Sequence, residues 1–174
     1  MKETELKLIA ELMKDARRSD RDLAKTIGAS QPTVSRLRTK LEKEGIVQEY
    51  AMIPDFHKLG FEILALTFIK VRSVLDPNRV ERVHAFVDER MKKTPFDIVM
   101  IEKGMGLGYD GVMISFHRDY SSFMDFRNFL RQYHLQDNTT DSFLVDLSDT
   151  KRYFPLTLSV LARHLRSSKE EKKE

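Results

Sequence analysis

Apolar residues in the amino-terminal part of the chain recur every three or four positions, the spacing that gathers them on one side of an α-helix. The first set predicts a helix over residues 4–15, the second a short helix ending at Gly28, and the third a helix from Ser30 to about Glu44. Their apolar positions are Leu6, Ile9, Leu12 and Met13; Leu23 and Ile27; and Val34, Leu37 and Leu41. The third stripe is expected to pack against the first two helices.

Residues with capping chemistry lie at the ends of the second and third helices. Ser19, three positions before an aspartate, resembles the start of a capping box. Ser30 is the natural N-cap of the third helix, with Pro32 in the first turn, where its missing N–H costs little. Gly28 and Gly45 end the two helices, because glycine accepts positive φ. A tight glycine turn between two such helices predicts a helix-turn-helix.

From residue 62 onwards the pattern changes to an alternation typical of strands, interrupted by helical spacing. Strands are predicted at 63–71, 96–102, 111–117 and 142–148, and helices around Val80–Met91 and Phe123–Tyr133. The order βαββαβ predicts a ferredoxin-like domain, a four-stranded antiparallel sheet with two helices on one face. A last helix is predicted over residues 156–165, with Leu158, Leu161 and Leu165 on one face, before a disordered charged tail.

Composition narrows the class of protein. Of 174 residues, 41% are hydrophobic and 33% charged, which is typical of a soluble globular chain. The sequence contains no apolar run of the roughly 18 residues that a membrane-spanning helix needs, and no signal-peptide core, so a cytoplasmic protein without a membrane partner is expected. The chain has no cysteine, which excludes disulfides, thiolate metal sites and cysteine nucleophiles.

Positive charge is concentrated on the second and third helices. The whole chain carries a net charge of +3, whereas residues 14–43 alone contain nine Lys or Arg and four acids, a local net of +5. On the third helix, donor-rich side chains lie opposite the apolar stripe, and the second helix of such a motif enters the major groove of DNA. The alternative is a solvated basic face with no ligand.

We therefore predict an interface for double-stranded DNA. On the third helix its residues are Gln31, Thr33, Ser35, Arg36, Arg38, Thr39, Lys40 and Lys43. Nearer the second helix, Arg17, Arg18, Arg21 and Lys25 are expected to contact phosphates, which positions a protein on the duplex without distinguishing sequences.

Residues 6–60 resemble the winged helix-turn-helix of the leucine-responsive/asparagine (Lrp/AsnC) family of transcriptional regulators. The resemblance rests on TVSRLRTKLEKEGIV at Thr33–Val47 and on YAMIPDFHKLG at Tyr50–Gly60. It implies that Ile46–Ile53 forms a strand leading out of the DNA-binding domain. It also implies that the second domain serves assembly and effector sensing, so that a homodimer, or a tetramer or octamer built from it, would bind an inverted-repeat operator.

The predicted fold class is therefore α+β, with an amino-terminal winged helix-turn-helix, a ferredoxin-like domain and a carboxyl-terminal helix. The expected boundaries are 1–53 for the DNA-binding domain, 54–62 for a linker, 63–150 for the dimerisation and effector domain, and 151–174 for the helix and tail.

The run GMGLGYDG at Gly104–Gly111 joins two predicted strands. A phosphate-binding glycine loop would need a strand-to-helix context, so a hairpin connection is the simpler interpretation. In the Lrp/AsnC family the corresponding connection carries a Gly-x-aromatic-Asp signature near a small-molecule site. The resemblance therefore suggests an effector site formed by Gly106, Gly108, Tyr109 and Asp110, although Leu107 stands where the family has glycine.

The sequence contains no local catalytic or metal motif. The five histidines are at least 17 residues apart, and neither a Walker loop nor a G-x-S-x-G elbow occurs. We expect a non-enzyme without metal or cofactor. Two alternatives stay open: a tetrapyrrole (siroheme) decarboxylase-like enzyme on the same two-domain scaffold, although the chain has few of the expected histidines and arginines, and a protein-binding winged-helix adaptor.

Overall fold

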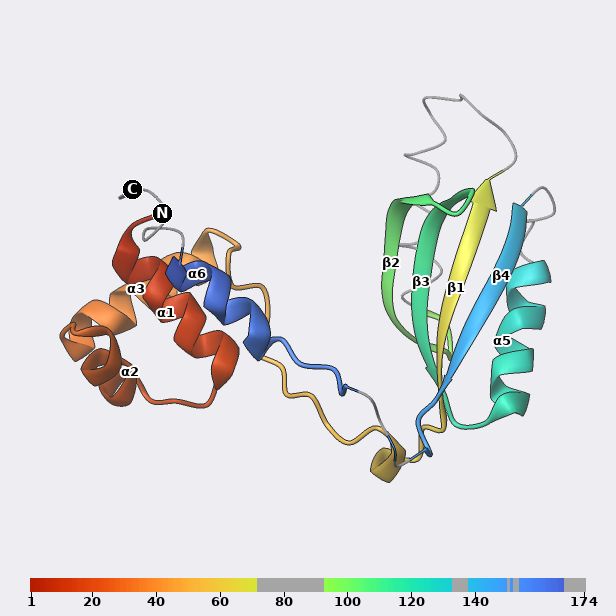
Figure 1. Ribbon diagram of the computed structural model, residues 1–174, viewed down its shortest axis with the longest axis horizontal. Helices are drawn as coiled ribbons and strands as arrows, with labels where there is room; N and C mark the ends of the chain where they lie inside the picture. The colour runs from red at the N-terminus through yellow and green to blue at the C-terminus, as the bar shows by residue number, and fades with distance from the viewer. Residues whose placement is uncertain (72–92, 133–137, 150, 152–153, 168–174) are drawn as a thin grey trace. The chain divides into compact units, whose positions relative to one another are not determined.

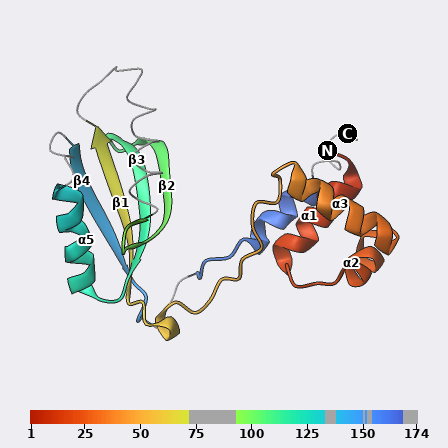
Figure 2. The ribbon, with the colours of Figure 1, turned by 180° about the vertical axis from the view of Figure 1, so that it is seen from behind.

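The computed structural model describes residues 1–71, 93–132, 138–149, 151 and 154–167, which belong to two compact units (Figures 1 and 2). Unit 1 combines Met1–Pro54 with the carboxyl-terminal Tyr153–Glu174, and unit 2 is Asp55–Arg152. The chain therefore returns to its first unit after building the second. The predicted helix around Val80–Met91 and the charged tail beyond residue 167 lie outside the described residues.

Three helices form the amino-terminal part of unit 1, close to their predicted bounds: α1 (Glu3–Lys14), α2 (Asp20–Ile27) and α3 (Gln31–Lys43). The Ser19 hydroxyl accepts the backbone N–H of Asp22 at 3.2 Å, and the Ser30 hydroxyl accepts that of Thr33 at 3.3 Å. Gly28 has φ +71°, in the left-handed region. These contacts confirm the predicted caps and the glycine turn of the helix-turn-helix.

The core of unit 1 confirms the predicted apolar residues of α2 and α3, whereas on α1 only Leu12 of the predicted stripe is in the buried cluster and its fully buried member, Leu8, was not predicted. Leu8, Leu23, Val34 and Leu41 are completely buried and form one cluster with Leu12, Ala24 and Ile27. This cluster joins all three helices, so the orientation of α3 is set by burial of its apolar side.

The predicted strand over Ile46–Ile53 is wrong, because these residues form no regular strand. The N–H groups of Ile46 and Val47 donate to the carbonyl of Leu41, at 2.9 and 3.2 Å, and so close the end of α3. The extended stretch that follows has no ladder partner in the described part of the chain. Extended backbone without cross-strand hydrogen bonds does not make a sheet.

A short carboxyl-terminal segment completes unit 1. It consists of the 3-10 helix η4 (Ser159–Arg163) and the single turn α6 (His164–Ser167), which both pack on α1 (Figures 1 and 2). The predicted helix over residues 156–165 was wrong in its start and in its buried face. Leu158 and Leu161 are 53% and 48% exposed, whereas Ala162 is fully buried. A 3-10 helix stacks residues three apart, so the α-helical projection used for the prediction does not apply.

Helix α1 has a second buried side, which faces away from the three-helix core. Ala10 lies about 200° around the helix from Leu8, and it is fully buried although it is not part of the three-helix cluster. Since η4 and α6 contact α1, we infer that they cover Ala10.

Replacing Ala162 with aspartate is expected to destabilise unit 1. The new carboxylate would have to be desolvated against α1 or the segment would have to detach, and we expect the free energy of unfolding to fall by about 1–3 kcal/mol. Chemical denaturation followed by circular dichroism measures the change. The matched control is Leu161→Asp at the exposed neighbouring position. Equal losses for the two variants would contradict docking through Ala162.

Unit 2 is built on a four-stranded antiparallel sheet of β1 (Ile63–Val71), β2 (Asp97–Gly106), β3 (Tyr109–His117) and β4 (Asn138–Asp146). The strand order is β2-β3-β1-β4, the order of a ferredoxin-like sheet. Helix α5 (Tyr120–Gln132) connects β3 to β4. The predicted α+β fold class is confirmed. β1 has its predicted bounds, whereas β2 extends into the glycine run and β4 begins four residues earlier than predicted.

The two faces of this sheet differ. One face packs on α5 through Ala65 and Met113, which contact the buried ring of Phe126 in one cluster. On the other face, Leu66 pairs with Ile114 on one side and with Phe143 on the other. Phe143 is 63% exposed, so this second face leaves apolar surface open to solvent.

His117 is a buried polar residue on the α5 side of the sheet. Its Nε2 lies 2.8 Å from the Ser115 hydroxyl, and its ring meets Phe126 at 5.1 Å between ring centres. Burial lowers the pKa of His117, and the nearby Asp97 carboxylate opposes part of that effect. The imidazole is therefore neutral in the folded protein at neutral pH.

The stability of unit 2 is expected to decrease as the pH falls from about 7 to 5. The pKa of His117 is lowered by folding, so below the unfolded value of about 6.5 the unfolded chain takes up a proton that the folded chain does not. The measurement is the free energy of unfolding across this range for the wild type and His117→Gln, with His164→Gln as an exposed control. An identical pH slope in the wild type and His117→Gln would contradict the assignment.

Candidate DNA-binding surface

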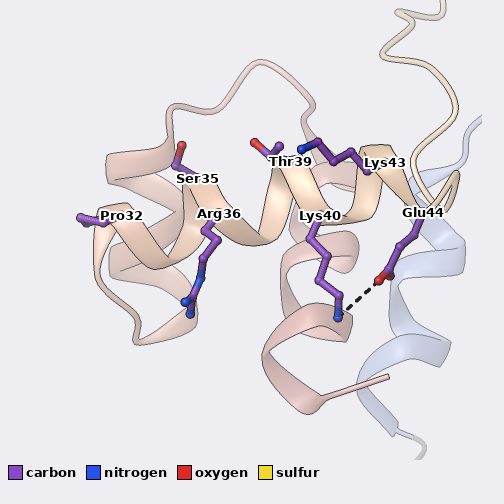
Figure 3. Close-up of a pocket in the computed structure, with 7 residues that line it drawn as sticks. All are labelled: Pro32, Ser35, Arg36, Thr39, Lys40, Lys43 and Glu44. Atoms are coloured by element: carbon purple, nitrogen blue, oxygen red, sulfur yellow. Dashed lines mark ion pairs between the residues drawn. The ribbon is translucent and has the colours of Figure 1, made fainter.

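Helix α3 presents one exposed side to solvent while its other side is buried in unit 1. Seven residues of that exposed side line a shallow hollow (Figure 3): Pro32, Ser35, Arg36, Thr39, Lys40, Lys43 and Glu44. They recur at intervals of three and four residues, so they form a stripe along the helix. The polar members of this stripe offer hydroxyl, guanidinium and ammonium donors, the groups that hydrogen-bond base edges and phosphates.

Three of the predicted DNA-binding cations are held by partners within unit 1. The Lys40 ammonium lies 2.6 Å from the Glu5 carboxylate, and the Arg38 guanidinium lies 2.7 Å from Asp20. Arg38 also donates to the carbonyl of Arg18 at 3.3 Å. These pairs tie α3 to α1 and to the start of α2.

Arg18 is the third cation with an internal partner. Its guanidinium lies 2.5 Å from the Glu11 carboxylate of α1, whose side chain is only 5% exposed. It also donates to the hydroxyl of Thr26 and to the carbonyl of Asp22. Arg18 therefore joins α1 to α2, a role that limits its freedom to reach a phosphate.

The remaining predicted cations are exposed, and in the described part of the chain none of their side chains has an acidic partner. They are Arg36 and Lys43 on α3 and Arg17, Arg21 and Lys25 near α2. Arg36 is flanked on the same stripe by Ser35 and Thr39 (Figure 3). This group combines an unpaired guanidinium with two short hydroxyls on a rigid helix.

Two other predicted residues lie at the start of α3. Gln31 is its exposed first residue. The Thr33 hydroxyl lies 2.8 Å from that of Ser30, so Thr33 takes part in the N-cap.

Sequence reasoning missed the two buried carboxylates that hold Lys40 and Arg18. Glu5 and Glu11 are 3% and 4% exposed on α1. The hydrogen bond from Lys40 lowers the pKa of Glu5, and the same bond raises the pKa of Lys40. Both acids lie three positions from the buried Leu8, so the polar positions bordering the apolar side of α1 were the available clue.

The structure brings the predicted effector residues to the β2–β3 hairpin. Leu107 and Gly108 form its turn, with φ of +52° and +78°, which are typical of a two-residue type I′ turn. The glycine run is therefore a strand-to-strand hairpin and not a strand-to-helix phosphate loop. Leucine at the first turn position is strained, because a side chain disfavours positive φ.

Tyr109 has a partner that the sequence did not indicate. Its hydroxyl donates to the Asp141 carboxylate of β4, and its ring lies 5.5 Å from that of Phe68. Phe68 of β1 pairs with Asp141 of β4, and this pairing places Asp141 next to Tyr109 although the two are distant in sequence. The hydrogen bond to Asp141 raises the pKa of Tyr109. Tyr109 is half-buried, whereas Asp110 and Asp141 are exposed.

Three further features concern a catalytic site, a metal site and a membrane span. Ser115 and His117 lie within hydrogen-bonding distance, but both are at most 3% exposed, so a substrate would have no access to them. Within the described residues, His, Asp and Glu do not gather in a group of three or more that could hold a metal ion. The same residues include no helix long and apolar enough to span a membrane.

Comparison with known proteins identifies the class of unit 1. The family model described as "Winged helix-turn-helix DNA-binding" matches residues 1–48, which contain α1, α2 and α3. The chain is 36% identical over 88 residues, half of its length, to the transcriptional regulator AzlB of Bacillus subtilis. It is 35% identical over 69 residues, 40% of its length, to the HTH-type transcriptional regulator LrpC of the same organism. The matched segments span about half of each relative, 53% of AzlB and 48% of LrpC.

Solved structures share the fold over nearly the whole chain. The structure of B. subtilis LrpC superposes with a TM-score of 0.65 at 24% identity, covering 87% of this chain and 99% of LrpC. The regulator NMB0573 of Neisseria meningitidis, solved as a complex with L-Met, gives a TM-score of 0.71 at 20% identity, covering 95% and 99%. Unit 1 therefore carries a winged helix-turn-helix of the DNA-binding type, and the chain as a whole has the fold of these regulators, among which the structure of E. coli AsnC gives a TM-score of 0.67 at 15% identity.

Proposed function

We propose that this protein is a sequence-specific DNA-binding transcriptional regulator of the Lrp/AsnC type that acts in the cytoplasm and catalyses no reaction. The observation that carries the proposal is the exposed stripe of α3, where the unpaired Arg36 stands between Ser35 and Thr39. A helix held on a buried core keeps such donors at fixed positions, as base recognition requires.

The internal ion pairs divide the predicted DNA-binding residues into two roles. We assign base contacts to Ser35, Arg36 and Thr39 in the major groove. The exposed cations would neutralise phosphates and set the register without distinguishing sequences: Lys43, Arg17, Arg21 and Lys25. Arg18, Arg38 and Lys40 are then positioning residues, because each is committed to a carboxylate within unit 1.

We propose that the protein acts as a homodimer formed through unit 2. The support is the sheet face opposite α5, where Leu66, Ile114 and the exposed Phe143 lie side by side. Association would remove this apolar surface from water. A two-fold dimer carries two copies of α3, which fits an inverted-repeat operator with half-sites in successive major grooves.

A small-molecule effector is proposed near the β2–β3 hairpin. The region carries Gly106, Gly108, Tyr109 and Asp110, with Asp141 and Phe68 beside Tyr109. The structural relative from N. meningitidis was solved with L-Met, which supports an amino acid as the first compound to test. An effector would act by binding one assembly geometry more tightly than another.

Selection from a random pool of duplex DNA at physiological salt tests the proposed function. The full chain is compared with a matched variant in which Ser35, Arg36, Thr39 and Lys43 are replaced by alanine. All four residues are exposed, so the variant should keep its fold. We expect an inverted-repeat motif for the wild type and none for the variant. Failure of the wild type to enrich any sequence would contradict the proposal.

A further inference from the structure

Lys40 lies on the exposed stripe of α3, yet its charge faces two carboxylates. Its ammonium is 2.6 Å from the carboxylate of Glu5 on α1 and 3.7 Å from that of Glu44 one turn further along α3. Figure 3 shows Lys40 and Glu44 pointing toward each other at this end of the helix. The three side chains together carry a net charge of −1, so the immediate surroundings of Lys40 are unfavourable for a phosphate.

Separating Lys40 from Glu5 would be energetically costly. Its side chain is only 4% exposed, and it accepts hydrogen bonds from the Lys40 ammonium and from the backbone N–H of Lys2, both at 2.6 Å. A buried carboxylate that loses its cationic partner is left with an uncompensated charge, which is strongly destabilising. A phosphate could recruit Lys40 only by imposing that cost.

The other two cations of the exposed stripe lack this competition. Arg36 and Lys43 occupy the same stripe, and no carboxylate pairs with them in the described part of the chain. On α3, the positive field available to DNA therefore comes from Arg36 and Lys43, while the field of Lys40 is cancelled locally.

We propose that Glu5 is a positioning residue that withholds Lys40 from the phosphate backbone. This inference rests on the proposed function. Withholding one cation reduces the sequence-independent part of the affinity and leaves the base-contacting part intact, so Glu5 raises the ratio of specific to non-specific binding.

The test is the salt dependence of binding to a non-specific duplex, since each phosphate contact contributes a slope of about 0.9 in log K against log salt concentration. Glu5→Gln can still accept the Lys2 N–H but leaves Lys40 uncommitted. It is expected to tighten non-specific binding and to steepen the slope by about one contact. Lys40→Gln, which keeps a donor for Glu5, is expected to leave the wild-type slope unchanged. The double variant should lose the gain of Glu5→Gln.

Glu3→Gln is the matched control. Glu3 lies on the same helix, pairs with Lys7 at 3.0 Å and is half exposed, so the change removes one negative charge without releasing Lys40. Equal effects of Glu5→Gln and Glu3→Gln would overturn the inference, as would a wild-type slope reduced by about one contact in Lys40→Gln. Thermal unfolding of each variant verifies that it is folded. A wild type that binds no duplex at any salt concentration would overturn the proposed function itself, a distinct result.

Discussion

Replacing Arg36 with alanine is expected to weaken binding to the selected operator by about 5- to 150-fold, the equivalent of the 1–3 kcal/mol that one good bidentate base contact supplies. Arg36 is exposed on α3 between Ser35 and Thr39, and no acidic partner competes for it in the described residues. Its loss should remove sequence discrimination more than general affinity. Fluorescence anisotropy with the operator and a scrambled duplex, at one salt concentration, measures both effects.

Two matched variants distinguish a base contact of Arg36 from a phosphate contact. Arg36→Lys keeps the charge but lacks the planar guanidinium needed for a bidentate contact, so it should lose most of the discrimination. Lys25→Ala removes a predicted phosphate contact and should weaken both duplexes to the same extent. If Arg36→Ala also weakened both duplexes equally, Arg36 would be a phosphate contact and the assignment of base recognition to it would fail.

Leu41→Ala is expected to lower the free energy of unfolding of unit 1 by about 2–5 kcal/mol, the range for removal of a buried leucine side chain. Leu41 is completely buried in the three-helix core, and its carbonyl accepts the N–H groups of Ile46 and Val47 at the end of α3. The cavity would loosen the helix that carries the DNA-binding stripe. Hydrogen exchange should show lost protection in α1, α2 and α3, with β1 and β3 unchanged.

Phe126→Ala is the reciprocal variant. Phe126 is fully buried between α5 and the sheet, so its truncation should cost unit 2 about 3–5 kcal/mol and leave exchange in α3 unchanged. Loss of protection in both units for either variant would show that the two units unfold together, contrary to this account.

The sequence was sufficient for features that depend on local chemistry. The caps at Ser19 and Ser30 and the turn at Gly28 involve residues within a few positions of one another, so their side chains and backbone preferences determine them directly. The bounds of β1 followed from its alternation and β-rich composition. The strand order β2-β3-β1-β4 followed from the predicted βαββαβ order of strands and helices along the chain.

Contacts between distant segments were not predictable in the same way. The contact between η4 and α1 joins residues about 150 positions apart, and no local sequence pattern predicts it. The same holds for the ion pairs Lys40–Glu5 and Arg38–Asp20, in which two residues predicted to contact DNA bind carboxylates of unit 1. The strand expected at Ile46–Ile53 failed for a related reason, because a strand depends on a partner that the segment itself does not specify.

The central claim is that α3 distinguishes one DNA sequence from others. The most direct test is the ratio of dissociation constants for a scrambled duplex and the selected operator, measured for the wild type at physiological salt. The account predicts a ratio of about 1,000 or more, the lower end for specific DNA-binding proteins, and a clear reduction in Arg36→Ala. A ratio near one would mean that the basic surface of unit 1 binds DNA without recognising its sequence, and would contradict the account.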